Sequence, residues 1–151
     1  MLHQKSRIHL VPVVTVALAL VLTLAATPTV ATAAAPSMPK DVQMVQPDPS
    51  LPEALAAFSG KWEGSGYHCG PTFPIQMFII VEKITKEKVG LYVFYSPIGW
   101  NRREANVTIE DGEYKLWYIS FAGRCEMMLR ANELVYDAQP SWFTLGLKRV
   151  P

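Results

Sequence analysis

Short runs of strand-forming residues, separated by turn signals, occupy most of the chain after Gly60. The runs are rich in Val, Ile, Thr, Tyr, Phe and Trp, a composition that favours β-strands. Asp111-Gly112 is a two-residue hairpin signal, and Ala122-Gly123, Ala131-Asn132 and Gln139-Pro140 mark further turns. The pattern predicts eight strands, which are Lys61–Tyr67, Gln76–Thr85, Gly90–Tyr95, Arg103–Ile109, Glu113–Phe121, Glu126–Arg130, Glu133–Asp137 and Phe143–Val150.

A single short helix is expected before these strands, over Leu51–Phe58, where LPEALAAF can form two turns. Many short strands with almost no helix imply a sandwich or a barrel. Tight sequential hairpins favour an antiparallel up-and-down arrangement, and closing it removes the exposed sheet edges. The pattern therefore predicts an all-β fold, an eight-stranded barrel with a short N-terminal helix. A barrel of this size encloses either packed side chains or one small ligand.

Several of the predicted strands are apolar on both faces, whereas a simple barrel with a polar exterior should alternate. In QMFIIVEKI the two faces are Met77, Ile79 and Val81 against Phe78, Ile80 and Ile84. EYKLWYISF and LYVFY repeat this pattern. One face can fill or line the barrel, and the other face needs a cover. The helix, the segment before it or a partner could provide that cover.

The first 35 residues differ from the rest of the chain. Lys5 and Arg7 precede an uncharged run rich in Val, Leu and Ala over 8–26, and small residues follow at 31–35. This three-part pattern is typical of a secretory signal peptide that is cleaved from the mature protein. A retained membrane anchor is the alternative, since the apolar run reaches the roughly 17 residues that a spanning helix needs. Either outcome predicts a secreted or periplasmic protein.

Residues 36–50 contain Pro36, Pro39, Pro47 and Pro49 and show no apolar periodicity, which predicts a Pro-rich linker before a barrel domain over 51–151. Of the 14 Lys and Arg residues, two lie in the first 35 residues, and all 13 Asp and Glu residues lie after them. The remaining near-neutral domain lacks the basic surface that nucleic-acid binding requires, so no nucleic-acid partner is expected. Membrane contact is expected only through an uncleaved N-terminal segment.

Cys69 and Cys125 are the only cysteines. In an exported protein an even number of cysteines is interpreted as a disulfide. A Cys69–Cys125 bridge would add roughly 3–4 kcal/mol by restricting the unfolded chain. A metal site of His68, Cys69, Cys125 and Glu126 is the alternative. Adjacent His68 and Cys69 point to opposite faces of an extended chain, which favours the disulfide and no metal.

No catalytic site is expected, because a nucleophile needs a nearby base and His68 is the only histidine after residue 35. The sequence contains no nucleophile elbow, zinc-protease motif or phosphate-binding glycine loop. Arg102-Arg103, after Trp100, forms either an anion clamp or a solvated turn. We therefore expect a binding protein without enzyme activity and without a cofactor.

Aromatic side chains with polar tips suit an apolar or amphipathic ligand. The candidate ligand-binding residues are Tyr92, Tyr95, Trp100, Trp117, Tyr118 and Trp142. Trp100 and Trp142 lie in or beside predicted loops, which could form the mouth of a barrel. Alternatively, these two residues anchor their loops against the barrel.

Gly60-Lys61-Trp62 begins the first predicted strand directly after the expected helix, and Arg149 lies near the end of the last strand. This arrangement resembles the lipocalin-like, or calycin, β-barrels, of a small exported bacterial type. The resemblance implies that Trp62 closes one end of the barrel and that Arg149 packs across it. A guanidinium stacks favourably on a Trp face, so the pair would join the first strand to the last. Both residues are expected to determine the fold rather than to bind a ligand.

The resemblance implies an exported barrel that holds a small apolar or amphipathic ligand, lined by the second, third and fifth strands. The layout also resembles the small periplasmic barrels that inhibit secreted metalloproteases, in which an N-terminal segment enters the protease cleft. Residues 36–50 would be that segment here. A structural, envelope-associated domain that docks on a partner protein through its apolar outer face is the third alternative.

Overall fold

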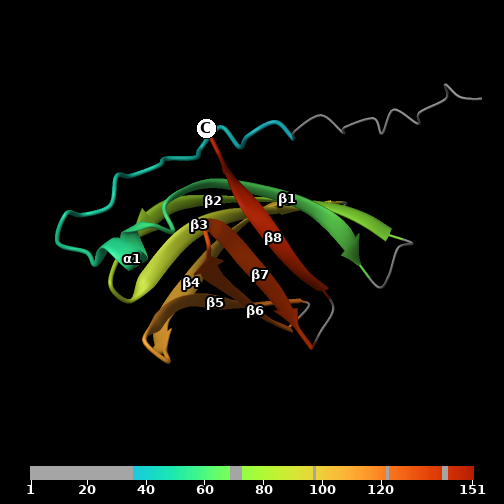
Figure 1. Ribbon diagram of the computed structural model, residues 1–151. Coiled ribbons are helices and arrows are strands. Elements are labelled where there is room, and N and C mark those ends of the chain that lie inside the picture. The colour runs from blue at the N-terminus through green and yellow to red at the C-terminus, as the bar shows by residue number, and fades with distance from the viewer. Residues whose placement is uncertain (1–35, 69–72, 97, 122, 141–142) are drawn as a thin grey trace, which may run out of the picture. The chain divides into compact units, whose positions relative to one another are not determined.

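The computed structural model describes residues 36–68, 73–96, 98–121, 123–140 and 143–151. Within this part, one short helix, α1 (Glu53–Ala56), precedes the strands. The strands are β1 (Gly60–His68), β2 (Phe73–Ile84), β3 (Lys88–Tyr95), β4 (Gly99–Glu110), β5 (Glu113–Ser120), β6 (Gly123–Arg130), β7 (Glu133–Gln139) and β8 (Phe143–Val150). Each strand pairs antiparallel with the next, and β8 pairs with β1 to close the barrel (Figure 1). The predicted all-β, up-and-down, eight-stranded barrel is confirmed.

The two ends of the barrel differ in their connections. The helix end carries α1 and the β2–β3, β4–β5 and β6–β7 hairpins, and the loop end carries the four other connections. Five strands extend beyond their predicted bounds at the loop end: β2 begins at Phe73, β4 at Gly99 and β6 at Gly123, while β1 ends at His68 and β7 at Gln139. The Gly, Pro and Asn residues in these extensions favour turns locally. Pairing with a neighbouring strand outweighs that preference.

The helix is shorter than predicted and lies inside the chain, directly before the barrel, rather than at its N-terminus. It forms one turn instead of the two turns expected over Leu51–Phe58. Leu55 and Phe58 are nevertheless buried in the hydrophobic core. The segment therefore closes the helix end of the barrel by packing these two side chains into the core.

Trp62 and Arg149 form the predicted pair at this end. The Arg149 guanidinium carbon lies 4.3 Å from the centroid of the Trp62 ring, and the two residues are direct partners in the β1–β8 ladder. Trp62 Nε1 donates a hydrogen bond to the Phe58 carbonyl at 2.9 Å, and Arg149 Nη2 donates to the Ala57 carbonyl at 2.6 Å. The buried Trp62 thus links the first strand, the last strand and the segment that contains α1.

The barrel consists of two four-stranded halves, β1–β4 and β5–β8, that are joined mainly at the helix end. The β4–β5 ladder covers only Asn106–Glu110 and Glu113–Trp117. The β1–β8 ladder covers only Lys61–Glu63 and Lys148–Val150. Toward the loop end these two ladders stop, and each strand continues beside its neighbour in its own half. In Figure 1, β1–β3 lie in the upper part of the view and β5–β7 in the lower part.

Two glycines allow β8 side chains to fill the boundary between β1 and β8. A Cβ atom placed on Gly64 would lie 2.6 Å from Leu147 Cδ2 and 2.7 Å from the Gly146 carbonyl oxygen. A Cβ atom on Gly66 would lie 2.3 Å from Leu145 Cδ2. The leucines therefore occupy the space that β1 side chains would otherwise need.

We expect Gly64→Ala to lower the free energy of unfolding by about 1–3 kcal/mol, because the added methyl meets a backbone oxygen that cannot move aside. Gly90→Ala is the matched control, since a Cβ there meets no atom within 4 Å. That variant should change stability by less than about 1 kcal/mol. Urea unfolding of both variants measures the difference, and equal effects would contradict the close contact at Gly64.

The structure confirms one sequence-based face assignment in β2 and β3 and corrects another. The apolar outer face of β2 and β3 is present, because Phe78, Ile80 and Tyr92 are buried although they point away from the barrel interior. Ile84 was predicted on that outer face, and this is wrong, because it packs in the inner core. The β2–β3 register shifts between Val81 and Lys83, and this irregularity reverses the alternation for the residues that follow.

Candidate functional site at the loop end

Inner-face side chains change character along the barrel. At the helix end they are mostly aliphatic and fully buried. Toward the loop end, Tyr95, Phe143 and Tyr136 stack in succession, with ring centroids 5.7 Å apart in each pair. Tyr118 faces Tyr136, and their hydroxyl oxygens lie 3.0 Å apart. Because Tyr95 belongs to β3 and the other three to β5, β7 and β8, the cluster spans both halves of the barrel.

Arg102 and Arg103, adjacent on β4, lie on opposite faces of the sheet. Arg103 is the ladder partner of Leu91, whose side chain is fully buried inside the barrel, so Arg103 shares the inner face. Arg102 lies on the outer face and pairs with Glu82, with Nη2 3.0 Å from Oε2. Both sequence interpretations of this pair are therefore wrong: the two guanidinium groups cannot clamp one anion together, and neither lies in a turn.

Arg103 places a positive charge near the tyrosines. No carboxylate of the described residues forms an ion pair with it. Its Nη1 lies 3.5 Å from the Arg102 carbonyl oxygen, at the limit of a hydrogen bond. Asn101, the ladder partner of buried Val93, shares the inner face two residues away. This part of the barrel thus combines one cation, amide and hydroxyl groups, and aromatic rings.

Burial raises the pKa of both tyrosines at this site. Burial raises the pKa of the Tyr118 hydroxyl far above its ordinary value, and the Arg103 charge acts in the opposite direction. Burial also raises the pKa of Tyr136, and the neighbouring Tyr118 adds to that increase. Both hydroxyls therefore stay protonated at neutral pH and can donate hydrogen bonds.

We expect the barrel to lose stability as the pH rises above about 10, the ordinary pKa of tyrosine. In the unfolded chain both hydroxyls would lose their protons there, whereas in the folded barrel Tyr118 and Tyr136 keep them. The free energy of unfolding should fall by up to about 1.4 kcal/mol per pH unit for each tyrosine. Urea unfolding between about pH 8 and about pH 11 measures the slope. The double variant Tyr118→Phe/Tyr136→Phe should show a flatter slope, and an equal slope would contradict the assignment.

The structure separates the aromatic residues that the sequence grouped as candidates. Tyr95 and Tyr118 lie on the inner face at the loop end. Tyr92 and Trp100 lie together on the outer face of β3 and β4. Trp117 lies on the outer face of β5, where the Arg124 guanidinium carbon is 4.6 Å from its ring centroid. Trp142 lies outside the described residues.

Residues 37–50, named the strap here, cover the outer aromatic cluster of β2–β4. Trp100 Nε1 donates to the Ser37 carbonyl at 2.9 Å, and the Tyr92 hydroxyl donates to Asp41 Oδ2. This hydrogen bond raises the pKa of Tyr92 and lowers the pKa of Asp41. In Figure 1 the strap follows the outside of the barrel toward α1. The second face of β2 and β3 thus receives its cover from the preceding segment, one of the three predicted possibilities.

Glu82 anchors the middle of the strap. It is 3% exposed and lies at the register shift in β2. The backbone amide of Gln43 donates to its Oε1 at 3.1 Å, and that of Val45 donates to its carbonyl oxygen at 2.7 Å. Arg102 neutralises the negative charge of Glu82. Each of the two buried carboxylate oxygens therefore has a hydrogen-bond partner.

The described residues test neither the predicted disulfide nor the alternative metal site, because both include Cys69. Cys125 is buried on the inner face, and its Sγ lies 3.3 Å from Ser120 Oγ. Cys69 lies outside the described residues, so the Cys69–Cys125 bridge stays a prediction. Within the described ranges, no group of three or more His, Cys, Asp or Glu side chains is placed to hold a metal ion.

The candidate residues chosen from the sequence do not include three residues of this cluster, which are Asn101, Tyr136 and Phe143. Alternation along β7 already indicated that Tyr136 shares a face with Leu134 and Ala138. It did not indicate which face is the inner one. Asn101 was assigned to a loop because Gly99 and Asn101 are poor strand formers.

Comparison of the chain with known protein families, curated proteins and solved structures finds no match. In the part of the chain that the structure describes, no helix is both long enough and apolar enough to cross a membrane. The lipocalin-like resemblance is therefore supported by the barrel and the Trp62–Arg149 pair alone.

Proposed function

We propose that this protein is an exported, non-catalytic β-barrel of lipocalin-like type that needs no cofactor and binds a small amphipathic molecule with an anionic group. The binding site lies between the two halves of the barrel at the loop end. The observation that supports this proposal is Arg103, an inner-face cation that no described carboxylate neutralises. A charge turned toward a barrel interior is costly unless an opposite charge or acceptors meet it. A ligand carboxylate or phosphate would provide that partner.

The neighbours of Arg103 suit the rest of such a ligand. Tyr118 and Tyr136 present hydroxyls that stay protonated and can donate to the anion. Tyr95 and Phe143 add aromatic surface to the lining, which suits an apolar chain. Binding sites for small molecules commonly combine a largely apolar lining with a few polar groups that fix orientation. The boundary between β4 and β5, where the ladder stops, offers the direction of entry.

The proposal is tested with residues 37–151, which form a compact unit with its own core, and the fluorescent fatty acid dansyl-undecanoic acid. We expect saturable binding to the unchanged protein. Arg103→Gln should weaken it about tenfold, the effect of losing one charge-assisted hydrogen bond. Arg102→Gln, a change of the adjacent arginine on the outer face, should leave the affinity unchanged. No saturable binding, or equal effects of the two substitutions, would contradict the proposal.

A protein-binding role, such as that of a periplasmic protease inhibitor, is the second candidate. The observation that favours it is the strap, which exposes Met38, Met44 and Val45 although its backbone is held on the barrel. Two surface depressions of about 710 and 480 Å³ flank it and share Val45, Lys83 and Thr85. Inhibition of a secreted metalloprotease that disappears with Met38→Ser/Met44→Ser would support this role. No inhibition by the unchanged protein would rule out that form of it.

A further inference from the structure

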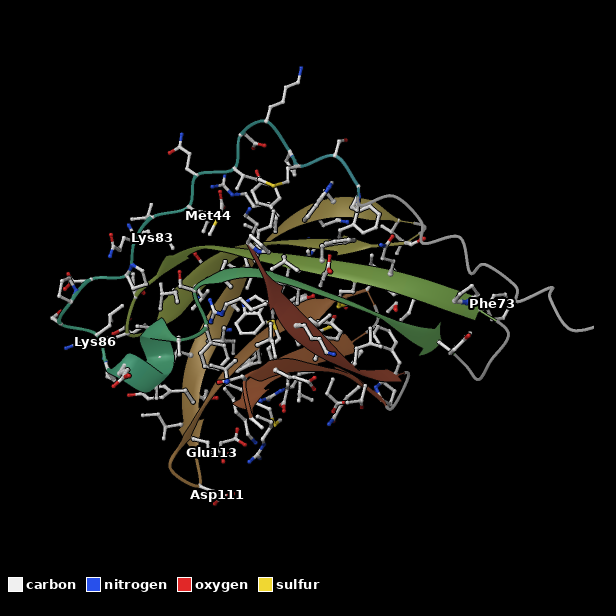
Figure 2. All side chains as sticks on the ribbon, turned by 45° about the horizontal axis from the view of Figure 1, so that its top comes forward. Met44, Phe73, Lys83, Lys86, Asp111 and Glu113 are labelled. Atoms are coloured by element: carbon white, nitrogen blue, oxygen red, sulfur yellow. The ribbon has the colours of Figure 1, made fainter. Side chains whose placement is uncertain are left out.

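Charged residues are distributed unevenly along the barrel. Residues 64–81, 89–101, 116–123 and 138–147 contain no Asp, Glu, Lys or Arg, and each range includes one connection of the loop end. The hairpins of the helix end carry charges of both signs, among them Lys86, Asp111 and Glu133. Figure 2 shows Phe73 at one end of the barrel and Lys83, Lys86, Asp111 and Glu113 away from it. The connections at one end of the barrel therefore carry charges, and those at the other end carry none. The charge nearest to them in β6 is Arg124, the ladder partner of Ile119, which pairs with Glu126 at 2.6 Å.

The uncharged end also carries most of the large exposed apolar side chains of the described barrel strands and turns. These are Tyr67, Phe73, Ile98, Ile119 and Phe121. Ile119 and Phe121 are 66% and 73% exposed. Single exposed apolar residues are common on proteins, but several gathered at one uncharged end indicate an interaction surface.

We propose that the loop end docks on the surface of a lipid bilayer, with Phe73, Ile119 and Phe121 entering the interfacial region. Phe73 begins β2, Ile119 lies near the end of β5, and Phe121 directly follows β5. A protein partner would be met by an apolar centre with a polar, hydrogen-bonding rim. Here the uncharged ranges include all four connections. A bilayer interface accepts aromatic and aliphatic side chains in any arrangement and needs no matching shape.

The charge distribution also predicts how membrane binding depends on salt. Because the inserted residues are uncharged, binding should depend on apolar burial and little on ionic strength. The charged helix end would face the water. This inference does not rest on the proposed ligand, since it uses solvent-exposed side chains that the ligand site does not include.

The experiment measures co-flotation of residues 37–151 with vesicles of phosphatidylcholine, alone and mixed with phosphatidylglycerol, at low and high salt. We expect binding to both kinds of vesicle. Ile119→Ser/Phe121→Ser should lower the bound fraction about tenfold or more, because two large apolar side chains are removed. Ile109→Ser is the matched control, since Ile109 is 61% exposed but belongs to the helix-end part of β4. That variant should bind as the unchanged protein does.

The inference is overturned if the unchanged protein does not float, or if Ile109→Ser costs as much binding as the double variant. It is also overturned if light scattering shows a dimer that the double variant dissociates while no vesicle binding occurs, because the surface would then join two copies. Circular dichroism confirms that each variant is folded. Failure here is distinguishable from failure of the ligand proposal. Ile119→Ser/Phe121→Ser should keep its affinity for dansyl-undecanoic acid, and Arg103→Gln should keep its vesicle binding.

Discussion

Replacing Trp62 with alanine should lower the free energy of unfolding by about 3–5 kcal/mol, the range for removing a large buried aromatic side chain. Trp62 is 1% exposed and packs with Leu55 and Phe58 at the helix end. Its loss would also remove the hydrogen bond to the Phe58 carbonyl and the ring beneath Arg149. The β1–β8 ladder is short, so this contact is a large part of what closes the barrel.

Urea unfolding monitored by far-ultraviolet circular dichroism measures this effect. Trp117→Ala is the matched control, because Trp117 lies on the outer face under Arg124 and takes no part in the β1–β8 ladder. It should cost about 1 kcal/mol or less. If both substitutions cost the same, Trp62 would be an ordinary aromatic residue rather than the closing residue of the barrel.

Removing the strap should produce the second large effect. A chain that begins at Leu51 should lose about 2 kcal/mol or more of stability, because the Phe, Tyr and Trp side chains that the strap covers on the outer face become exposed. Glu82 would lose the amide hydrogen bonds from Gln43 and Val45 while remaining beside Arg102. The conformational entropy that the strap regains offsets part of the loss. The newly exposed aromatic surface should also bind a hydrophobic dye several-fold more strongly.

Urea unfolding and the fluorescence of anilinonaphthalene sulfonate measure these two changes. Met44→Ser in the longer chain is the control, since Met44 is 44% exposed and its replacement should change neither quantity. Unchanged stability and dye binding in the shortened chain would mean that the contacts of Asp41, Gln43 and Val45 contribute little in solution.

Only part of the candidate site could be predicted from the sequence. Tyr95 and Tyr118 were identified because aromatic residues stand out in a β-rich chain, and both lie at the site. Tyr92, Trp100 and Trp117 have the same local signature but lie on the outer face. The arginine pair was noticed as one unit, whereas β4 turns Arg103 inward and Arg102 outward. Residue type identified these side chains, and the strand direction decided their roles.

The sequence by itself determined the number, order and approximate bounds of the strands, because apolar periodicity and turn residues act over a few neighbouring positions. It also determined that β2 and β3 are apolar on both faces, and the resemblance identified Trp62 and Arg149 as a pair. Only the tertiary structure decided which face is inside, that Ile84 crosses to the core, and that the strap covers the outer aromatic cluster. It alone decided that the uncharged connections gather at one end. These features depend on strand stagger, register and long-range packing, which no local stretch of sequence contains.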